Sequence, residues 1–112
     1  MNIKFQDRDL EKNLNDEKRM LKAYGQNRAK RLRVRMAVLG KAKNLSEVPN
    51  IPPDRCHKLT GDYKGHFAVD LDQPYRLIFK PLEPVPLLPD GGFDLKSITS
   101  IIILGVSNHY GR

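Results

Sequence analysis

Residues 55–79 read RCHKLTGDYKGHFAVDLDQPYRLIF, and they hold the clearest strand pattern in the chain. Apolar and polar residues mix at strand spacing over residues 55–60, 65–71 and 75–80, and turn residues (Gly-Asp, then Asp-Gln-Pro) separate the three runs. Alternation of this kind is typical of strands that bury one face. The stretch therefore predicts a three-stranded antiparallel meander.

The third run also fixes the direction of an arginine. Tyr75, Leu77 and Phe79 are two residues apart, so their side chains share one face of a strand. Arg76 lies between them in sequence and points to the opposite face. If the apolar trio packs in the core, Arg76 is presented on the other side of the sheet.

Upstream of the meander, the pattern changes. Met1–Phe5 alternates apolar and polar residues, which predicts a short strand, and Asp7 or Asp9 can cap a helix after it. An apolar stripe at helical spacing continues to about Tyr24, where Gly25 supplies a stop signal. We expect one helix between these points.

A second helix is expected from about Gln26 to near Gly40, which weakens its end. Its apolar stripe steps by three or four residues: Ala29, Leu32, Met36 and Leu39. Cations flank the stripe, Arg28, Arg31 and Arg35 on one edge and Lys30 and Lys41 on the other. Two helices joined at one glycine predict an antiparallel hairpin whose apolar sides face the sheet, with the arginines at its rim or outside.

Two segments rich in proline separate the remaining elements. Asn44–Asp54 connects the hairpin to the meander, and residues 81–97 form a surface excursion after it. Ile98–Val106 is apolar on both faces, which is typical of a strand with a neighbour on each side. That strand delivers residues 107–110 to the end of the sheet.

Together these elements predict an α+β fold in one domain, residues 1–112. The expected order is β-α-α-β-β-β-β, with the N-terminal strand and the basic helical hairpin packed on a small, antiparallel-rich sheet. A chain of this length builds one modest core and has no room for a second domain.

The formal net charge of +7 predicts a polyanionic partner such as nucleic acid, an anionic membrane or an acidic protein. Between Glu17 and Glu47 there is no acid, whereas ten cations fall there: Lys18, Arg19, Lys22, Arg28, Lys30, Arg31, Arg33, Arg35, Lys41 and Lys43. This block predicts an electrostatic footprint, and a merely solvated helical face is the alternative.

Composition excludes several other classes. No apolar run approaches the roughly 20 residues of a membrane span, and the acid-containing start of the chain is unlike a signal peptide. We therefore expect a cytoplasmic protein without a membrane partner. Cys56 is the single cysteine, so neither an internal disulfide nor a cysteine-based zinc site is expected. The sequence predicts no metal and no cofactor.

The motifs resemble those of the RelE/ParE toxin superfamily, and most closely the HigB-like toxins. Residues 55–67 and then 75–79 are similar to the HigB-like pattern of His, Leu, Gly-Asp, Gly and an aromatic residue, followed by Tyr-Arg-x-x-Phe. The hairpin with Ala29 and Leu32, and the segment Asn44–Val48 after it, are also similar. The resemblance covers almost the whole chain and implies a RelE-like fold.

This resemblance implies a toxin of a type II toxin-antitoxin system that cuts mRNA in the ribosomal A site. Such cleavage needs a base for the 2′-hydroxyl proton, a cation for the phosphate and an acid for the leaving 5′-oxygen, and it requires no metal. The implied partners are the ribosome with its rRNA, mRNA, and a HigA-like antitoxin with a helix-turn-helix.

The resemblance also implies roles for two residues of the meander. Arg76 matches the arginine of the family's Tyr-Arg motif, where a guanidinium grips two phosphate oxygens; a structural ion pair is the alternative. His57 aligns with the histidine of the HigB-like motif. Thr60 stands where several relatives place a catalytic lysine, so Lys58 and Lys64 are the candidates to replace it. The full set expected to bind RNA is Arg28, Lys30, Arg31, Arg35, Lys58 and Lys64.

The C-terminus departs from the HigB-like pattern. Asn108-His109-Tyr110 resembles the His-Tyr ending of YoeB toxins rather than Asp-Tyr-His. An imidazole is the natural acid or base, and a phenol donates a hydrogen bond or stacks on a base. His109 and Tyr110 are therefore expected to be catalytic, and a frayed chain end without a role is the alternative.

Two other functions fit the same fold. A non-catalytic toxin of the ParE type, which inhibits gyrase, is consistent with the missing lysine. A regulatory "killer suppression" member of the pair is the third possibility. The lack of a recognisable helix-turn-helix favours a toxin over a DNA-binding antitoxin.

Overall fold

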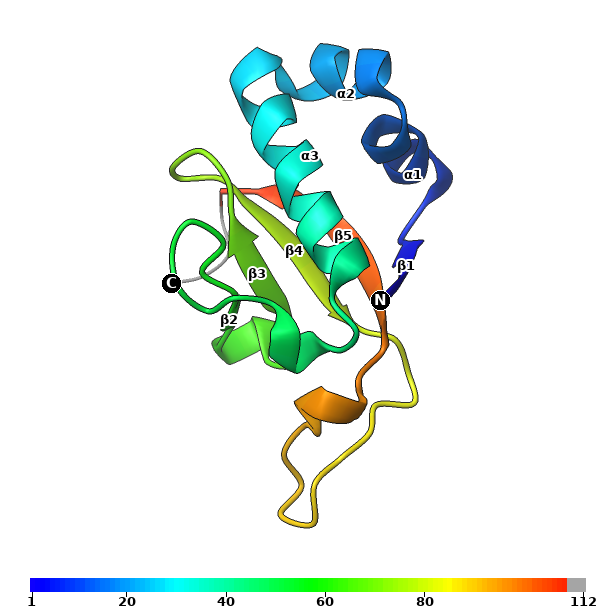
Figure 1. Ribbon diagram of the computed structural model, residues 1–112, viewed down its shortest axis with the longest axis vertical. Coiled ribbons are helices and arrows are strands. Elements are labelled where there is room, and N and C mark those ends of the chain that lie inside the picture. The colour runs from blue at the N-terminus through cyan, green and yellow to red at the C-terminus, as the bar shows by residue number, and fades with distance from the viewer. Residues whose placement is uncertain (109–112) are drawn as a thin grey trace.

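The computed structural model describes residues 1–108 as a mixed five-stranded sheet with three helices on one side (Figure 1). The helices are α1 (Arg8–Asn15), α2 (Glu17–Tyr24) and α3 (Gln26–Lys41). The strands are β1 (Asn2–Phe5), β2 (His57–Lys58), β3 (Phe67–Asp70), β4 (Arg76–Pro81) and β5 (Ser100–Ser107). This α+β architecture is the one that the sequence predicts.

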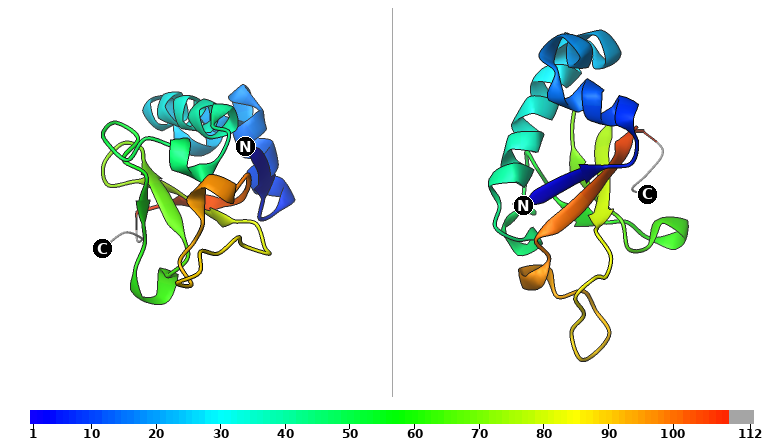
Figure 2. Two further views of the ribbon diagram at one scale, coloured as in Figure 1. Left: turned by 60° about the horizontal axis from the view of Figure 1, so that its bottom comes forward. Right: turned by 90° about the vertical axis from the view of Figure 1, so that its right-hand side faces the viewer.

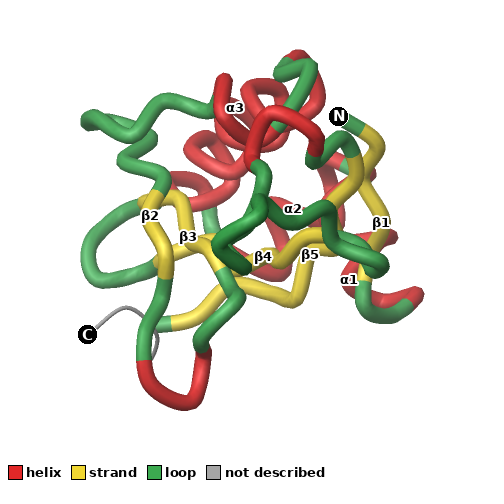
Figure 3. Tube along the Cα trace, turned by 90° about the horizontal axis from the view of Figure 1, so that it is seen from below, coloured by secondary structure: helices red, strands yellow, loops and turns green. Residues whose placement is uncertain are grey.

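The strands lie in the order β1-β5-β4-β3-β2. The pairs β2–β3, β3–β4 and β4–β5 are antiparallel, whereas β1 pairs parallel with β5. The predicted meander is confirmed, and β5 has a neighbour on each side as its apolar pattern indicated. Figure 2 shows the helices covering one face of this sheet, and Figure 3 shows the strands from below.

The helical part differs from the predicted hairpin at one residue. Asp16 has an extended backbone (φ −123°, ψ 119°) and separates α1 from α2. Its carboxylate accepts hydrogen bonds from the amides of Lys18 and Arg19, at 2.9 and 3.3 Å, which caps α2. The single helix expected up to Tyr24 is therefore wrong. An aspartate satisfies the amides at the start of a new helix better than it fits the interior of a long one.

The helix boundaries on either side agree with the sequence. Asp7 caps α1 through a 2.8 Å hydrogen bond from the amide of Leu10. Gly25 ends α2 and begins α3 with φ +80°, a left-handed backbone that favours glycine. At the other end of α3, the Met1 nitrogen donates to the carbonyls of Leu39, Gly40 and Ala42.

The main core lies between the helices and the sheet. Ala29, Leu32 and Leu39 of α3 are buried there, as their spacing predicted. Leu77 and Phe79 of β4 are fully buried in the same core. A second, smaller cluster lies on the opposite face of the sheet and contains Leu59, Ala68 and Ile78. Since alternate residues of β4 belong to different clusters, the expected alternation of the strand is confirmed.

The first strand of the meander is shorter than predicted. Arg55 has a left-handed backbone (φ +44°), and Gly61–Tyr63 forms a 3₁₀ turn, so only His57–Lys58 pairs regularly with β3. Residues 82–99 form the expected excursion between β4 and β5. Its tip is held by a bridge between Leu87 and Phe93, and Leu95–Ser97 is a second 3₁₀ turn.

Candidate functional site

The register of the meander places His57 and Arg76 on the same face of the sheet. His57 is opposite Ala68, Ala68 is opposite Ile78, and Arg76 is two residues before Ile78. Side chains opposite each other in antiparallel strands share a face, as do residues two apart. This face is the one that α1–α3 do not cover. The direction predicted for Arg76 is therefore confirmed.

Arg76 contacts an acidic residue on the neighbouring strand. Asp70 is its register partner, and the Arg76 Nε atom lies 3.4 Å from Asp70 Oδ1. The Arg76 side chain is 17% exposed and that of Asp70 is 12% exposed. Arg76 thus has the ion pair that the sequence left open as an alternative to phosphate binding.

Arg55 makes the closer pair with the same carboxylate. Its Nε and Nη2 atoms donate to Asp70 Oδ2 and Oδ1 at 2.6 and 2.9 Å, a bidentate geometry. These hydrogen bonds raise the pKa of Arg55 above its usual value. Two guanidiniums and one carboxylate carry a net charge of +1, so the cluster Arg55–Asp70–Arg76 still attracts an anion.

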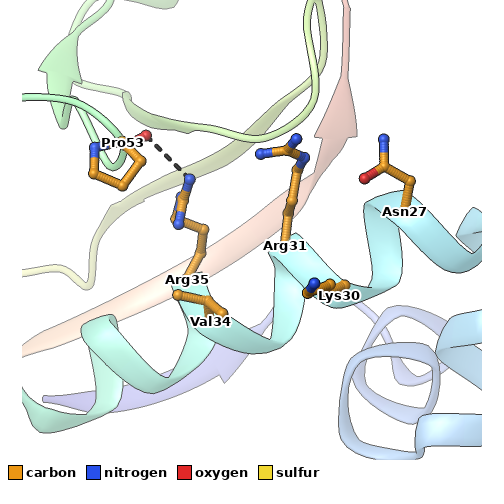
Figure 4. Close-up of a pocket in the computed structure, with 6 residues that line it drawn as sticks. All are labelled: Asn27, Lys30, Arg31, Val34, Arg35 and Pro53. Carbon is orange, nitrogen blue, oxygen red and sulfur yellow. Dashed lines mark hydrogen bonds between the residues drawn. The ribbon is translucent and has the colours of Figure 1, made fainter.

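Arg35 anchors this cluster from the helical side. Its Nε atom donates to the Asp70 backbone carbonyl at 2.7 Å, and Nη2 donates to the Pro53 carbonyl at 3.1 Å (Figure 4). Its Nη1 atom lies 3.5 Å from Asp54 Oδ1. Arg35 is only 4% exposed. The expectation that it lies at the rim of the helices is wrong, because the acids and carbonyls of the connector and β3 draw its guanidinium inward.

Arg28 is also paired within the protein. Its guanidinium makes two hydrogen bonds to Asp72, at 3.0 and 3.1 Å, and lies 3.4 Å above the centre of the Tyr75 ring. The hydrogen bond with Asp72 raises the pKa of Arg28. A guanidinium held by an acid and an aromatic ring stabilises the packing of α3 on the β3–β4 turn. Arg28 is 22% exposed and lies at the rim of the helices, where the sequence predicted it, but its guanidinium is held by Asp72 and Tyr75.

The cations of the acid-free block that stay exposed and unpaired are fewer than the ten that the sequence places there. Within residues 1–108, seven of them are exposed and make no hydrogen bond or ion pair through their side chains: Lys18, Arg19, Lys22, Lys30, Arg31, Lys41 and Lys43. Arg33 lies 3.5 Å from Glu17. Lys30 and Arg31 flank a surface hollow of about 270 Å³, whose other walls include Val34 and Pro53 (Figure 4).

His57 has a defined tautomer in its neutral form. Its Nδ1 atom lies 2.7 Å from the carbonyl oxygen of Arg55. A carbonyl only accepts, so Nδ1 carries the proton and Nε2 has the lone pair. Nε2 is covered from solvent and has no hydrogen-bond partner among residues 1–108. The imidazole is therefore oriented as a base, and substrate reaches Nε2 only when the covering atoms move.

The two lysines proposed to replace the missing catalytic lysine lie elsewhere. Lys58 is opposite Phe67, a residue of the main core, so its side chain leaves the strand on the face opposite His57. Lys64 follows the turn Gly61–Tyr63 and is exposed. Neither is brought to the face that carries Arg76 by the strand register. His109 and Tyr110 lie outside the described residues. The predicted resemblance of the C-terminus to YoeB toxins therefore stays a prediction.

Sequence reasoning did not single out Arg55 and Asp70 as site residues. Both are within the stretch that identified the meander, and the predicted turn between β3 and β4 would have placed Asp70 opposite Arg76. The bidentate pair was not accessible to that reasoning, because it depends on the left-handed backbone at Arg55. In the part of the chain that the structure describes, no three His, Cys, Asp or Glu side chains are grouped to hold a metal.

The fold is that of a RelE-like toxin of a type II toxin-antitoxin system. The family model of HigB-like toxins, described as the RelE-like toxin HigB of type II systems, matches residues 3–85. The chain therefore belongs to the HigB-like toxin family, and a cognate antitoxin is its implied partner. No curated protein matches the sequence. Within residues 1–108, no helix is long and apolar enough to cross a bilayer.

Proposed function

We propose that this toxin is a metal-independent endoribonuclease that cleaves mRNA on the ribosome. The observation that carries the proposal is that Arg76, in the cluster Arg55–Asp70–Arg76 of net positive charge, lies on the same helix-free face of the sheet as His57, two strands away. Membership of the HigB-like family supports it. Cleavage on the ribosome would place the protein in the cytoplasm.

The reaction needs little from the protein. A base removes the 2′-hydroxyl proton, the resulting oxygen attacks the adjacent phosphorus, and the bond to the 5′-oxygen breaks as that oxygen takes up a proton. The products are a 2′,3′-cyclic phosphate and a 5′-hydroxyl. The crowded phosphate carries additional negative charge in the transition state, which a fixed guanidinium stabilises.

Arg76 is assigned to the phosphate. Asp70 is already held by two short hydrogen bonds from Arg55, whereas its contact with Arg76 is longer at 3.4 Å. A phosphate therefore competes with Asp70 for Arg76 without leaving the carboxylate unneutralised. The cluster keeps the guanidinium in place before substrate arrives, which lowers the entropy cost of the contact.

The proton transfers are assigned to imidazole and phenol groups. His57 has the tautomer of a base at Nε2, and His109 and Tyr110 supply an acid or hydrogen-bond donor in the YoeB-like interpretation of the C-terminus. Since Nε2 of His57 is covered, Arg76 ranks first among the proposed catalytic residues, followed by His109, Tyr110 and His57.

The exposed cations of α2 and α3 are proposed to dock on rRNA. Lys30 and Arg31 lead this set, because neither has an internal partner among residues 1–108. The antitoxin is proposed to be HigA-like and to contain a helix-turn-helix. It is also expected to be acidic, because a toxin of net charge +7 attracts a partner of opposite charge. Co-purification with the product of the adjacent gene, followed by a toxicity assay, tests that partner.

The deciding experiment is to induce the protein in cells and map mRNA 5′ ends with and without translation. Codon-phased cuts that require ribosomes are expected for the wild type and are lost in Arg76→Ala. Intact mRNA together with DNA damage would instead support the gyrase inhibitor. Uncut mRNA and undamaged DNA with growth arrest would refute both.

A further inference from the structure

A second surface, on the far side of strand β2, has the properties of a nucleotide site. A groove of about 550 Å³ lies between the β2–β3 turn and the tip of the excursion that follows β4. Strand β2 contributes Lys58, the turn contributes Lys64 and His66, and the excursion contributes Gly91, Gly92 and Phe93. The family match ends at residue 85, so the excursion's wall is a feature of this chain beyond the matched region.

Hydrogen bonds and a ring contact hold the tip of the excursion in place. Leu88 donates to the carbonyl of Gly92 at 2.7 Å, and Asp90 accepts from the amide of Gly92 at 2.8 Å. The Phe93 ring packs against Phe67, with 6.3 Å between ring centroids. These contacts hold the half-buried Phe93 ring in the groove, against the buried ring of Phe67.

Glycines around the groove leave the approach to the Phe93 ring free of bulky side chains. Gly65 has φ +90°, and a Cβ atom added there would lie 3.8 Å from the edge of the Phe93 ring. Gly61 and Gly91 also have positive φ, and a Cβ atom at either would meet nothing within 4 Å. The walls at these positions are backbone, so a flat ligand meets no side chain there as it approaches the Phe93 ring.

The groove is cationic. Lys58 and Lys64 line it, and neither makes a hydrogen bond or an ion pair with a residue in the range 1–108. Among residues 1–108, no carboxylate lines the groove, and the nearby Asp90 accepts a hydrogen bond from the Gly92 amide. A half-buried aromatic ring and two lysines that line one groove fit a planar ligand that carries an anion, which is the chemistry of a nucleotide.

We propose that this groove binds one nucleotide of single-stranded RNA next to the cleaved bond. The base stacks on the half-buried Phe93 ring, and Lys58 and Lys64 contact the phosphates. Lys58 and His57 are consecutive residues whose side chains leave edge strand β2 on opposite faces. An RNA strand that crosses this edge meets both the groove and the Arg76 face. The inference rests on the proposed ribonuclease function for its choice of ligand.

The test is an NMR titration of the ¹⁵N-labelled protein with a 2′-O-methyl tetranucleotide, which lacks the attacking hydroxyl. The amides of Gly61, Gly65, Gly91 and Gly92 report on the groove, and they are expected to shift together. Phe93→Ala should weaken binding about tenfold or more, the usual effect of removing one stacking ring. Lys58→Gln with Lys64→Gln should weaken it and lower its salt dependence, whereas the exposed control Lys96→Gln should not.

The controls separate this proposal from its alternatives. Inorganic phosphate that reproduces all the glycine shifts would show a general anion site and overturn the proposal, as would shifts confined to other surfaces. The lysine pair is exposed, so that variant tests the groove even if Phe93→Ala unfolds. Loss of the glycine shifts alongside codon-phased mRNA cleavage would refute the groove alone. Glycine shifts in a protein that never cuts mRNA would refute the ribonuclease and leave an RNA-binding groove.

Discussion

Asp70 lies directly opposite Arg76 in the register between β3 and β4, and its Oδ1 atom is 3.4 Å from Arg76 Nε. The same carboxylate receives two shorter hydrogen bonds from Arg55, and the Asp70 carbonyl receives one from Arg35 of α3. Asp70 thereby connects the helical layer to the face proposed to meet mRNA. On that face, Asp70 holds Arg55 more closely than Arg76, so Arg76 is the arginine that is more easily released to another anion.

Arg76→Ala should abolish growth arrest and reduce ribosome-dependent RNA cleavage by about a hundredfold, the usual effect of losing a transition-state contact. Arg76→Lys should recover little, because an ammonium lacks the bidentate fork of a guanidinium. Thermal stability should change only slightly, since Arg55 still neutralises Asp70. A fully toxic Arg76→Ala protein would show that cleavage does not use this face.

Asp70→Asn should reduce both stability and cleavage. An amide cannot neutralise two guanidiniums, and the lost charged hydrogen bonds amount to about 1–3 kcal/mol. The lower part of this range is expected, because the Arg55 side chain is 38% exposed and solvent screens it. Urea unfolding measures the stability. Arg55→Lys is the matched variant: it keeps the charge and loses the fork, so a cleavage rate equal to that of wild type would mean that Arg55 does not position Arg76.

The strands were predictable from the sequence because each one carries its own pattern. Leu77 and Phe79 alternate with Arg76 and Ile78, and the two sets do lie in different clusters. The break at Asp16 was not predicted, because the apolar stripe continues past it at helical spacing. Only the capping geometry of the carboxylate shows that two helices meet there.

The candidate site was predictable only in part, for an electrostatic reason. A count of cations in sequence treats Arg28, Arg31 and Arg35 alike, since all three flank one stripe of α3. Their surroundings differ because of acids distant in sequence: Asp72 holds Arg28, and Asp54 with the Asp70 carbonyl holds Arg35. Arg31 pairs with no acid in the described range 1–108 and stays exposed.

Cys56 should be unreactive toward iodoacetamide in the folded protein. Burial, with a smaller contribution from Asp54, raises the pKa of the Cys56 thiol to about 12. Its thiolate is therefore scarce at pH 8, and alkylation should be more than about a hundredfold slower than in the urea-unfolded chain. Mass spectrometry after timed alkylation measures both rates. Equal rates would show that the thiol is accessible in the folded state.

The same shift predicts how stability depends on alkaline pH. The unfolded thiol loses its proton near pH 8.5, whereas the folded thiol keeps it until about pH 12. A folded pKa above the unfolded one favours unfolding as pH rises through this window. The melting temperature should therefore fall from about pH 8.5 upward, and the fall should be smaller in Cys56→Ala. An identical fall in both proteins would assign it to other groups.

Charge reversal should separate docking from folding. Replacing Lys30 and Arg31 by Glu should leave the unfolding free energy nearly unchanged, because both side chains are exposed and unpaired within residues 1–108. Ribosome association should weaken strongly, and the slope of log affinity against log salt should fall by roughly one for each cation removed. Lys96→Glu, an exposed site on the excursion, is the control for net charge. Arg35→Ala is the contrasting variant, because Arg35 is buried and paired. Its loss leaves the buried Asp54 carboxylate and the Asp70 carbonyl without their partner, and should cost about 3–5 kcal/mol of stability. Ribosome association that survives Lys30→Glu with Arg31→Glu at moderate salt would exclude this part of α3 as the docking surface.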